Sequence, residues 1–191
     1  MTHTIFDTPI VNTLFRFIST LGLKLTGWKL SGKKPNARKY VLIAAPHTSN
    51  WDFILVIAIA FRFGIKISWM GKSGLFKGPM GPIMRWMGGI PVERSRNTGL
   101  VQQVVDRFNA SEDLIVTIPP EGTRSKVGQW KSGFYHVAAG AGVPIALGFL
   151  DFKTKVGGFG PMFFPTEKYE DDLKKIQDFY RGMTGKRPHR F

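Results

Sequence analysis

The fold is decided by residues 40–61, which read YVLIAAPHTSNWDFILVIAIAF. The first six of them, YVLIAA, form an apolar run that is too continuous for a half-exposed strand, so they predict a buried one. A polar turn, PHTSNW, follows, and residues 52–63 are then expected to form a helix that is mostly apolar. A buried strand that runs through a turn into a helix is the repeating unit of α/β folds.

The same alternation continues along the rest of the chain. Further strands are expected at residues 65–70, around 90–93, at 113–119 and at 143–151. Further helices are expected within residues 78–89, and at 98–108, 131–142 and 169–183. We therefore predict an α/β fold with a mainly parallel sheet flanked by helices.

The composition limits the classes of protein to consider. With 191 residues the chain is expected to form one domain, or one domain with an appendage. It has no cysteine, which excludes disulfides, thiolate metal sites and cysteine nucleophiles. No apolar run is long enough for a classical membrane span, and no signal peptide is visible at the start of the chain.

The charge is strongly unbalanced, with 27 Lys and Arg against 13 Asp and Glu, a net charge of +14. Such a surface attracts polyanions, which are either nucleic acid or an anionic membrane. Charge alone does not choose between them. However, the chain carries no recognisable nucleic-acid motif and its cations are spread along its whole length, so we expect no nucleic-acid partner.

Residues 9–25, PIVNTLFRFISTLGLKL, have apolar residues at spacings of three and four, which predicts a helix with an apolar stripe. One interpretation is an interfacial helix whose apolar side enters lipid while its basic residues contact headgroups. The other is an ordinary amphipathic helix packed on its own domain, which is the commoner case.

His47 and Asp52 are the first candidates for catalysis, because His47 follows the strand at 40–45 almost directly. Loops at the carboxyl ends of strands form the ligand crevice of open α/β sheets. A neutral imidazole there can take a proton from a hydroxyl, while a carboxylate on its other nitrogen fixes the tautomer. The two side chains can meet if His47 lies in the entry turn and Asp52 in the first helical turn. The alternative is a turn histidine beside a helix-capping aspartate.

A second group of candidates follows the strand at 113–119, in the sequence IPPEGTRS. Glycine allows a close approach of the backbone to a ligand, and arginine offers a bidentate fork to phosphate. A solvated turn with an ion pair would look the same. The candidates in this turn are Glu121, Gly122, Thr123 and Arg124.

Lys72 and Arg94 also follow predicted strands and are expected to face the same crevice as Arg124. Several cations around one histidine indicate an anionic substrate whose hydroxyl is activated. A solvated basic rim is the alternative. No metal site is expected, because one histidine and one aspartate fall short of the usual three or four ligands.

Together these residues carry a family resemblance, spanning residues 41–150. The chain resembles the glycerophospholipid acyltransferases, in particular the bacterial lysophosphatidic acid acyltransferases. PHTSNWD resembles the H-x4-D block of that family, KSGLFKGPMG with GGIPVER its second block, PPEGTRS its third, and KSGFYHVAAGAGVPI the helix and Val-Pro block that follow.

The resemblance implies transfer of an acyl group from acyl-CoA or acyl-carrier protein to the hydroxyl of a lysophospholipid. The expected acceptor is 1-acylglycerol-3-phosphate, and no cofactor is expected besides the acyl donor. His47 would be the general base and Asp52 its orienting partner. Glu121, Gly122, Thr123 and Arg124 would shape the acceptor site, with Arg124, Arg94 and Lys72 as candidates for binding its phosphate.

The resemblance also implies a mixed, mainly parallel sheet and an N-terminal amphipathic membrane-docking helix. Residues 1–34 would then be the membrane anchor and residues 35–191 the α/β acyltransferase domain, bound as a peripheral or monotopic protein at the cytoplasmic face of a bacterial inner membrane. The competing hypothesis is a non-catalytic basic protein that binds anionic membrane or nucleic acid, with a purely structural histidine.

Overall fold

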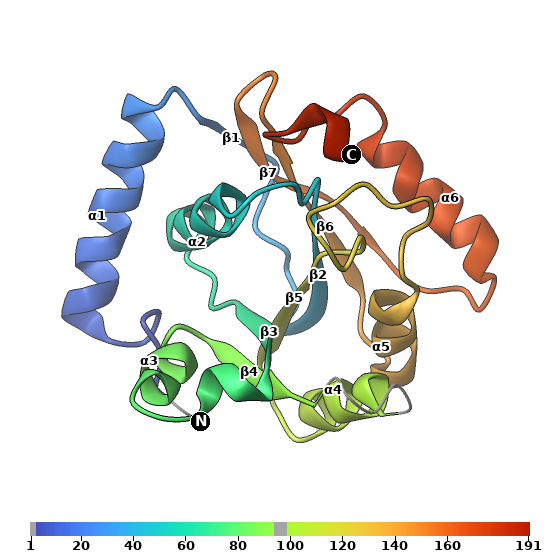
Figure 1. Ribbon diagram of the computed structural model, residues 1–191, viewed down its shortest axis with the longest axis horizontal. Helices are drawn as coiled ribbons and strands as arrows, with labels where there is room; N and C mark the ends of the chain where they lie inside the picture. Colours follow the sequence, from blue (N-terminus) through green and yellow to red (C-terminus); the bar gives the residue numbers. More distant parts are fainter. Residues whose placement is uncertain (1–2, 94–98) are drawn as a thin grey trace.

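The computed structural model describes residues 3–93 and 99–191. Its centre is a seven-stranded sheet in the order β1-β7-β6-β2-β5-β3-β4 (Figure 1). The strands are β1 (Lys29–Ser31), β2 (Lys39–Ala45), β3 (Ser68–Lys72), β4 (Gly89–Val92), β5 (Leu114–Ile118), β6 (Ile145–Asp151) and β7 (Val156–Phe163). All neighbouring strands are parallel except β6 and β7, so the predicted mixed, mainly parallel sheet is confirmed.

Helices cover both faces of this sheet. They are α1 (Pro9–Leu25), α2 (Trp51–Phe63), α3 (Met80–Trp86), α4 (Leu100–Asn109), α5 (Gly133–Ala141) and α6 (Tyr169–Tyr180), with short 3₁₀ helices η1 (Ser73–Phe76) and η2 (Pro188–Arg190). Each lies within a few residues of its predicted position where a helix was predicted.

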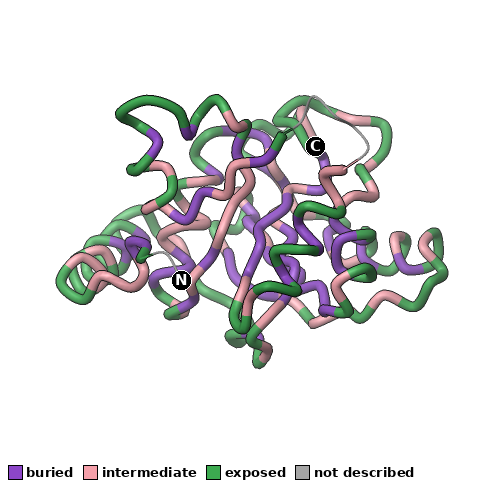
Figure 2. Tube along the Cα trace, turned by 90° about the horizontal axis from the view of Figure 1, so that it is seen from below, coloured by how far each residue is buried: buried purple, intermediate pink, exposed green. Residues whose placement is uncertain are grey.

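The alternation of side chains along β2 explains the two layers. Val41 and Ile43 pack on one face with α4, α5 and α6, whereas Tyr40 and Leu42 pack on the other face with α2. Because successive side chains of a strand point to opposite faces, a continuous apolar run is what a doubly covered strand needs. Figure 2 shows buried residues concentrated in the central strands and exposed residues along the outer helices.

Helix α1 packs along α2 at one side of the molecule (Figure 1). Phe15 stacks on Phe61 with ring centroids 5.4 Å apart, and Leu23 is buried beside Ile59. The predicted packed helix is therefore confirmed for one side of α1. Within the described residues, no helix is both long enough and apolar enough to cross a membrane.

Two strands lie where none was predicted. β7 has the sequence VGGFGPMF, whose three glycines and one proline are poor strand formers. It pairs antiparallel with β6 across a short connection, with Asp151 opposite Val156. β1 has three residues and pairs with β7, so part of the segment predicted as membrane anchor belongs to the same sheet.

Candidate active site

A cavity of about 720 Å³ opens at the carboxyl ends of the central parallel strands. Its floor and walls include residues in β3 and at or next to the ends of β2, β4, β5 and β6: Met70, Ala44, Val92, Ile118 and Leu150. This is the edge at which open α/β sheets bind ligands. The volume is within the range of small-molecule sites.

His47 and Asp52 meet at this cavity, and both are among its lining residues. The Nδ1 atom of His47 lies 3.2 Å from Oδ2 of Asp52. His47 lies in the loop after β2 and Asp52 in the first turn of α2, so the predicted meeting of the two side chains is confirmed. The side chain of Asp52 is 3% exposed and that of His47 is 23% exposed, so the imidazole is the member of the pair that a ligand can reach.

Asp52 organises the whole loop before it. Its Oδ2 accepts the backbone N–H groups of Thr48 and Ser49 at 2.7 and 2.8 Å, and its Oδ1 accepts the Ser49 hydroxyl at 2.8 Å. Burial alone would raise the pKa of Asp52, but the hydrogen bonds from His47, Ser49 and Thr48 outweigh it and hold that pKa below its usual value. The carboxylate therefore stays charged beside the imidazole, and it fixes which nitrogen of His47 carries the proton.

Glu121 supports the same loop from below the surface. Glu121 is 2% exposed, and its Oε1 accepts a hydrogen bond from the backbone N–H of His47 at 3.0 Å. Burial raises its pKa above the usual value. Its Oε2 has no hydrogen-bond partner among the described residues. Glu121 was expected to shape the acceptor site, but it is not among the residues that line the cavity; it contacts the backbone of His47 instead.

Gly122, Thr123 and Arg124 line the cavity, and their role in binding an acceptor stays a prediction. Gly122 has φ +66°, which favours glycine, and a Cβ there would lie 2.8 Å from Cδ of Lys131. The Thr123 hydroxyl accepts the backbone N–H of Ser125 at 3.3 Å and closes the turn. The turn thus presents Arg124 beside the cavity.

Lys131 also lines the cavity and was not predicted as a site residue. Its backbone N–H donates to the carbonyl of Pro120 at 2.8 Å, which holds it against the turn that carries Arg124. The signal was its place directly before the helix that begins at Gly133, on the same side of the sheet as the turn after β5.

The other two predicted cations are placed differently. Lys72 ends β3, but it is exposed and is not among the cavity-lining residues; the strand runs directly into η1 at this point. Arg94 lies outside the described residues. In the ranges 3–93 and 99–191, no group of three or more His, Asp and Glu side chains is arranged to hold a metal ion.

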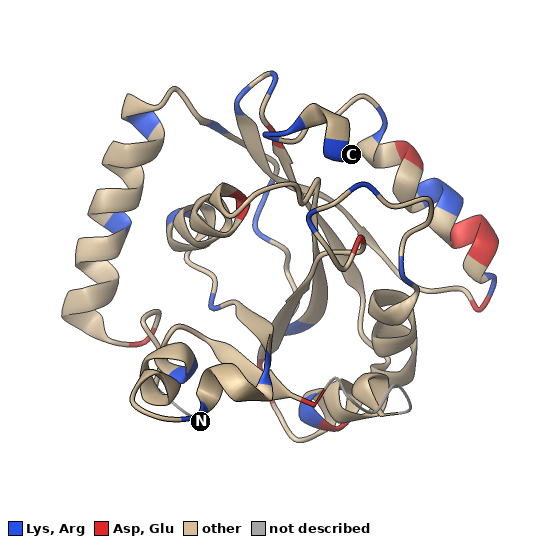
Figure 3. Ribbon diagram, viewed as in Figure 1, with Lys and Arg blue, Asp and Glu red and all other residues tan. Residues whose placement is uncertain are grey.

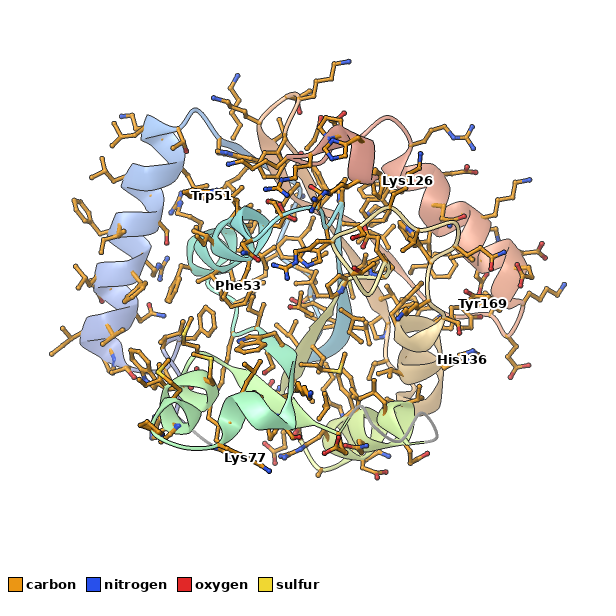
Figure 4. The ribbon with its side chains drawn as sticks, in the orientation of Figure 1. Trp51, Phe53, Lys77, Lys126, His136 and Tyr169 are labelled. Atoms are coloured by element: carbon orange, nitrogen blue, oxygen red, sulfur yellow. The ribbon has the colours of Figure 1, made fainter. Side chains whose placement is uncertain are left out.

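The remaining walls of the cavity are apolar. They come from α2, α4, α5 and β3, and include Phe53, Val56, Trp69, Leu100, Val104 and Phe134. Phe53, labelled in Figure 4, packs edge-on against Trp69 at 5.6 Å. The site therefore combines an imidazole, a buried carboxylate and two cations with a wall that suits a hydrocarbon chain.

A comparison with family models gives a match to the model described as Acyltransferase over residues 28–146, more than half of the chain. The chain belongs to the Acyltransferase family. It is therefore an acyltransferase-family protein, which favours an enzyme over the non-catalytic binding protein suggested by the charge alone. Family membership also implies an acyl donor and an acceptor.

Two curated relatives of this acyltransferase are each named 1-acyl-sn-glycerol-3-phosphate acyltransferase. The protein from Escherichia coli K12 is 30% identical over 131 residues, which cover 63% of this chain and 52% of the relative. The protein from Haemophilus influenzae is 28% identical over 131 residues, covering 63% and 53%. The match thus spans about half the length of these relatives.

Among solved structures, the fold is similar to that of the 1-acyl-sn-glycerophosphate (LPA) acyltransferase PlsC from Thermotoga maritima. The TM-score is 0.61, and the match covers 91% of this chain and 78% of the other at 15% identity. At that identity the likeness supports the fold of the acyltransferase, an α/β sheet flanked by helices.

Proposed function

We propose that the protein transfers a fatty acyl group from acyl-CoA or acyl-carrier protein to the hydroxyl of a lysophospholipid in phospholipid biosynthesis. The proposed acceptor is 1-acylglycerol-3-phosphate. The observation that carries this proposal is the His47–Asp52 pair beside two cations in a largely apolar cavity of an acyltransferase-family chain. An anionic head and a hydrocarbon chain are the two chemical features such a cavity complements.

In the proposed reaction His47 is the general base. Its Nδ1 is held by Asp52, which leaves Nε2 to accept the proton of the acceptor hydroxyl. As the O–H bond breaks, the acceptor oxygen forms a bond to the thioester carbonyl carbon. The tetrahedral intermediate then collapses, the C–S bond breaks, and the imidazolium returns its proton to the departing thiolate.

Direct attack by the acceptor is favoured over an acyl-enzyme. The chain has no cysteine, and the hydroxyl that contacts Asp52, that of Ser49, is buried and donates to this carboxylate. Ser49 is also absent from the cavity lining. A serine nucleophile needs an adjacent base that takes its proton, and here the partner of the hydroxyl is a carboxylate whose pKa is lowered.

We predict that Arg124→Ala weakens the use of a phosphorylated acceptor. Charge-assisted hydrogen bonds contribute about 1.5–3 kcal/mol, so kcat/KM should fall roughly 10- to 100-fold, with a higher acceptor KM. The measurement is a titration of 1-acylglycerol-3-phosphate at saturating donor.

Two controls isolate the role of the phosphate. Arg62→Ala removes the same charge from the last turn of α2 and should leave the kinetics unchanged. Monoacylglycerol, which lacks the phosphate, should be used equally poorly by wild type and Arg124→Ala. An unchanged acceptor titration in Arg124→Ala would refute the assignment.

We also propose that α1 docks on an anionic membrane. Residues 1–34 would serve as the anchor, although their strand β1 also belongs to the sheet of the catalytic domain, residues 35–191. Six apolar residues of α1 are exposed, with exposed fractions between 45% and 84%: Ile10, Leu14, Phe17, Ile18, Leu21 and Leu25. They form one side of the helix, different from the side that packs on α2. Arg16, Thr20 and Lys24 follow each other at spacings of four beside them.

The charges of the protein also favour docking on an anionic membrane. An apolar helix face bordered by basic residues is the pattern of helices that lie in the headgroup region, and +14 attracts anionic lipid. Figure 3 shows Lys and Arg dispersed over many loops and helix ends, which fits a broad anionic surface better than one narrow ligand. The proposed location is the cytoplasmic face of a bacterial inner membrane, as a peripheral or monotopic protein.

We predict that Phe17→Glu releases the protein from vesicles. Burial of a phenylalanine side chain contributes about 1.5–3 kcal/mol, so partitioning onto phosphatidylglycerol vesicles should weaken roughly 10- to 100-fold. Flotation measures it directly. Thr20→Glu, which places the same charge on the polar side of α1, should lower binding far less. Equal losses in the two variants would contradict insertion of the apolar face.

A further inference from the structure

Residues 184–187, Thr-Gly-Lys-Arg, lie against the loop that carries His47. This segment is outside residues 28–146, the part of the chain that matches the family model. It follows α6, whose Ile176 and Tyr180 are buried in the main core, so its approach to the loop is fixed by packing. The segment also contacts residues at the end of β6 and at the start of α2.

One end of the segment is tied to β6. The backbone N–H of Thr184 donates to Oδ1 of Asp151 at 3.0 Å, and the Thr184 carbonyl accepts the N–H of Phe152 at 2.8 Å. Asp151 ends β6, the parallel neighbour of β2, with Ala45 opposite Phe149. The segment therefore lies at the end of β6, at the same edge of the sheet where the catalytic loop leaves the neighbouring strand β2.

The other end of the segment contacts Thr48, which is fully buried. The backbone N–H of Arg187 donates to the Thr48 hydroxyl at 3.2 Å. A Cβ on Gly185 would lie 2.5 Å from Cγ2 and 2.6 Å from Oγ1 of Thr48. The backbone of Gly185 is not in the left-handed region, so it is the space beside Thr48, and not conformation, that requires glycine here.

A third contact reaches the residue before Asp52. The Lys186 ammonium lies 4.4 Å from the centre of the Trp51 ring, a cation–π distance. Trp51, labelled in Figure 4, is half exposed at the start of α2. The segment thus touches Thr48, which donates to Asp52, and Trp51, which directly precedes Asp52.

We propose that residues 184–187 position the catalytic pair, with Gly185 and the Arg187 N–H fixing Thr48. The connection runs from Thr48, whose own N–H donates to Asp52 at 2.7 Å, to the carboxylate that holds His47. None of the segment's residues lines the cavity, so they act through the loop and not on substrate. The expected effect on catalysis rests on the proposed function. The inference that residues 184–187 hold the loop in place does not.

The test is Gly185→Ala, compared with Gly128→Ala, a loop glycine with no atom within 4 Å of an added Cβ. The new methyl group should displace Thr48. Since a misplacement of about 1 Å costs roughly 10²-fold in rate, kcat should fall about 10- to 100-fold with both KM values within about twofold. Gly128→Ala should match wild type.

Hydrogen exchange gives a readout that needs no substrate. The amides of Thr48 and Ser49 are hydrogen-bonded to Asp52, so Gly185→Ala should accelerate exchange in residues 47–52 while strands β2 and β5 stay protected. Thr48→Val, which keeps the shape but removes the acceptor for Arg187, should accelerate the same amides. Thr48→Val therefore provides the same test if Gly185→Ala does not fold.

Rescue separates positioning from a general loss of stability. Combining Gly185→Ala with Thr48→Ala removes both Cγ2 and Oγ1, the two atoms closest to the new methyl group, and should recover kcat to the level of Thr48→Ala alone. Unchanged exchange at residues 47–52 in Gly185→Ala and Thr48→Val overturns the proposal. So does a wild-type kcat despite faster exchange, or a folded double variant without recovery. If the wild-type protein transfers no acyl group, the proposed function is wrong. The exchange experiment then still tests whether residues 184–187 hold the loop at residues 47–52.

Discussion

His47→Ala should abolish measurable acyl transfer while the protein stays folded. A positioned general base contributes about 10²–10⁴-fold, and no other imidazole lines the cavity in the part of the chain that the structure describes. The fold should tolerate the change because the side chain of His47 is partly exposed and Asp52 keeps its three hydrogen bonds from Thr48 and Ser49. The measurement is kcat with saturating acyl-CoA and lysophospholipid.

The matched control is His136→Ala. His136, labelled in Figure 4, is exposed on α5, stacks on Tyr169 with centroids 5.8 Å apart, and does not line the cavity. It should keep wild-type activity. Calorimetry of both variants shows whether each is folded. A folded His47→Ala protein that keeps most of its activity would rule out the base mechanism.

Asp52→Asn should give the second largest effect, on activity and on stability together. The substitution keeps the shape but replaces the charged acceptor of four groups: the imidazole of His47, two backbone N–H groups and the Ser49 hydroxyl. We expect kcat to fall on the order of 10²-fold, because the imidazole loses the partner that fixes its tautomer. We expect the free energy of unfolding at pH 7 to fall by about 2–3 kcal/mol.

The pH dependence of that stability loss has a definite sign. The pKa of Asp52 is lower in the folded protein than its ordinary value of 3.8, so the folded state favours the carboxylate. The stabilisation is therefore fully present above the ordinary carboxyl pKa and is lost as the pH falls through the folded value. Asparagine does not titrate. The difference in unfolding free energy between wild type and Asp52→Asn, measured by denaturant unfolding, should shrink as the pH falls from 7 toward 3; a constant difference would contradict the assignment.

The sequence predicts the central strands well because their patterns are local. A run such as YVLIAA needs two apolar faces wherever it lies, and β2 is indeed covered on both sides. β7 could not be predicted in this way. Its Gly-Gly and Gly-Pro pairs do not favour a strand, and its pairing depends on the neighbouring β6 and on β1.

The site could be predicted where it depends on strand ends and not where it depends on side-chain direction. Residues after β2 and β5 lie at one edge of a parallel sheet, so His47 and Arg124 were found from their positions alone. Glu121 and Lys72 also follow or end strands, yet one is buried behind the loop and the other is exposed outside the cavity. Strand position does not specify which way such a side chain turns.

The contact between residues 184–187 and Thr48 is the least predictable part of the site. Arg187 and Thr48 are 139 positions apart in the sequence, and neither lies in a sequence pattern that points to the other. Gly185 resembles any loop glycine in the sequence. The packing of α6 on the core and the two hydrogen bonds of Thr184 at the end of β6 bring it to the loop.

The most direct test of the account is the product formed by the purified protein from radiolabelled acyl-CoA and 1-acylglycerol-3-phosphate. We predict labelled phosphatidate from wild type, none from His47→Ala, and no label retained on the protein after gel filtration in denaturant. Release of free fatty acid without any labelled phospholipid, across a panel of lysophospholipids and with acyl-carrier protein as alternative donor, would contradict it.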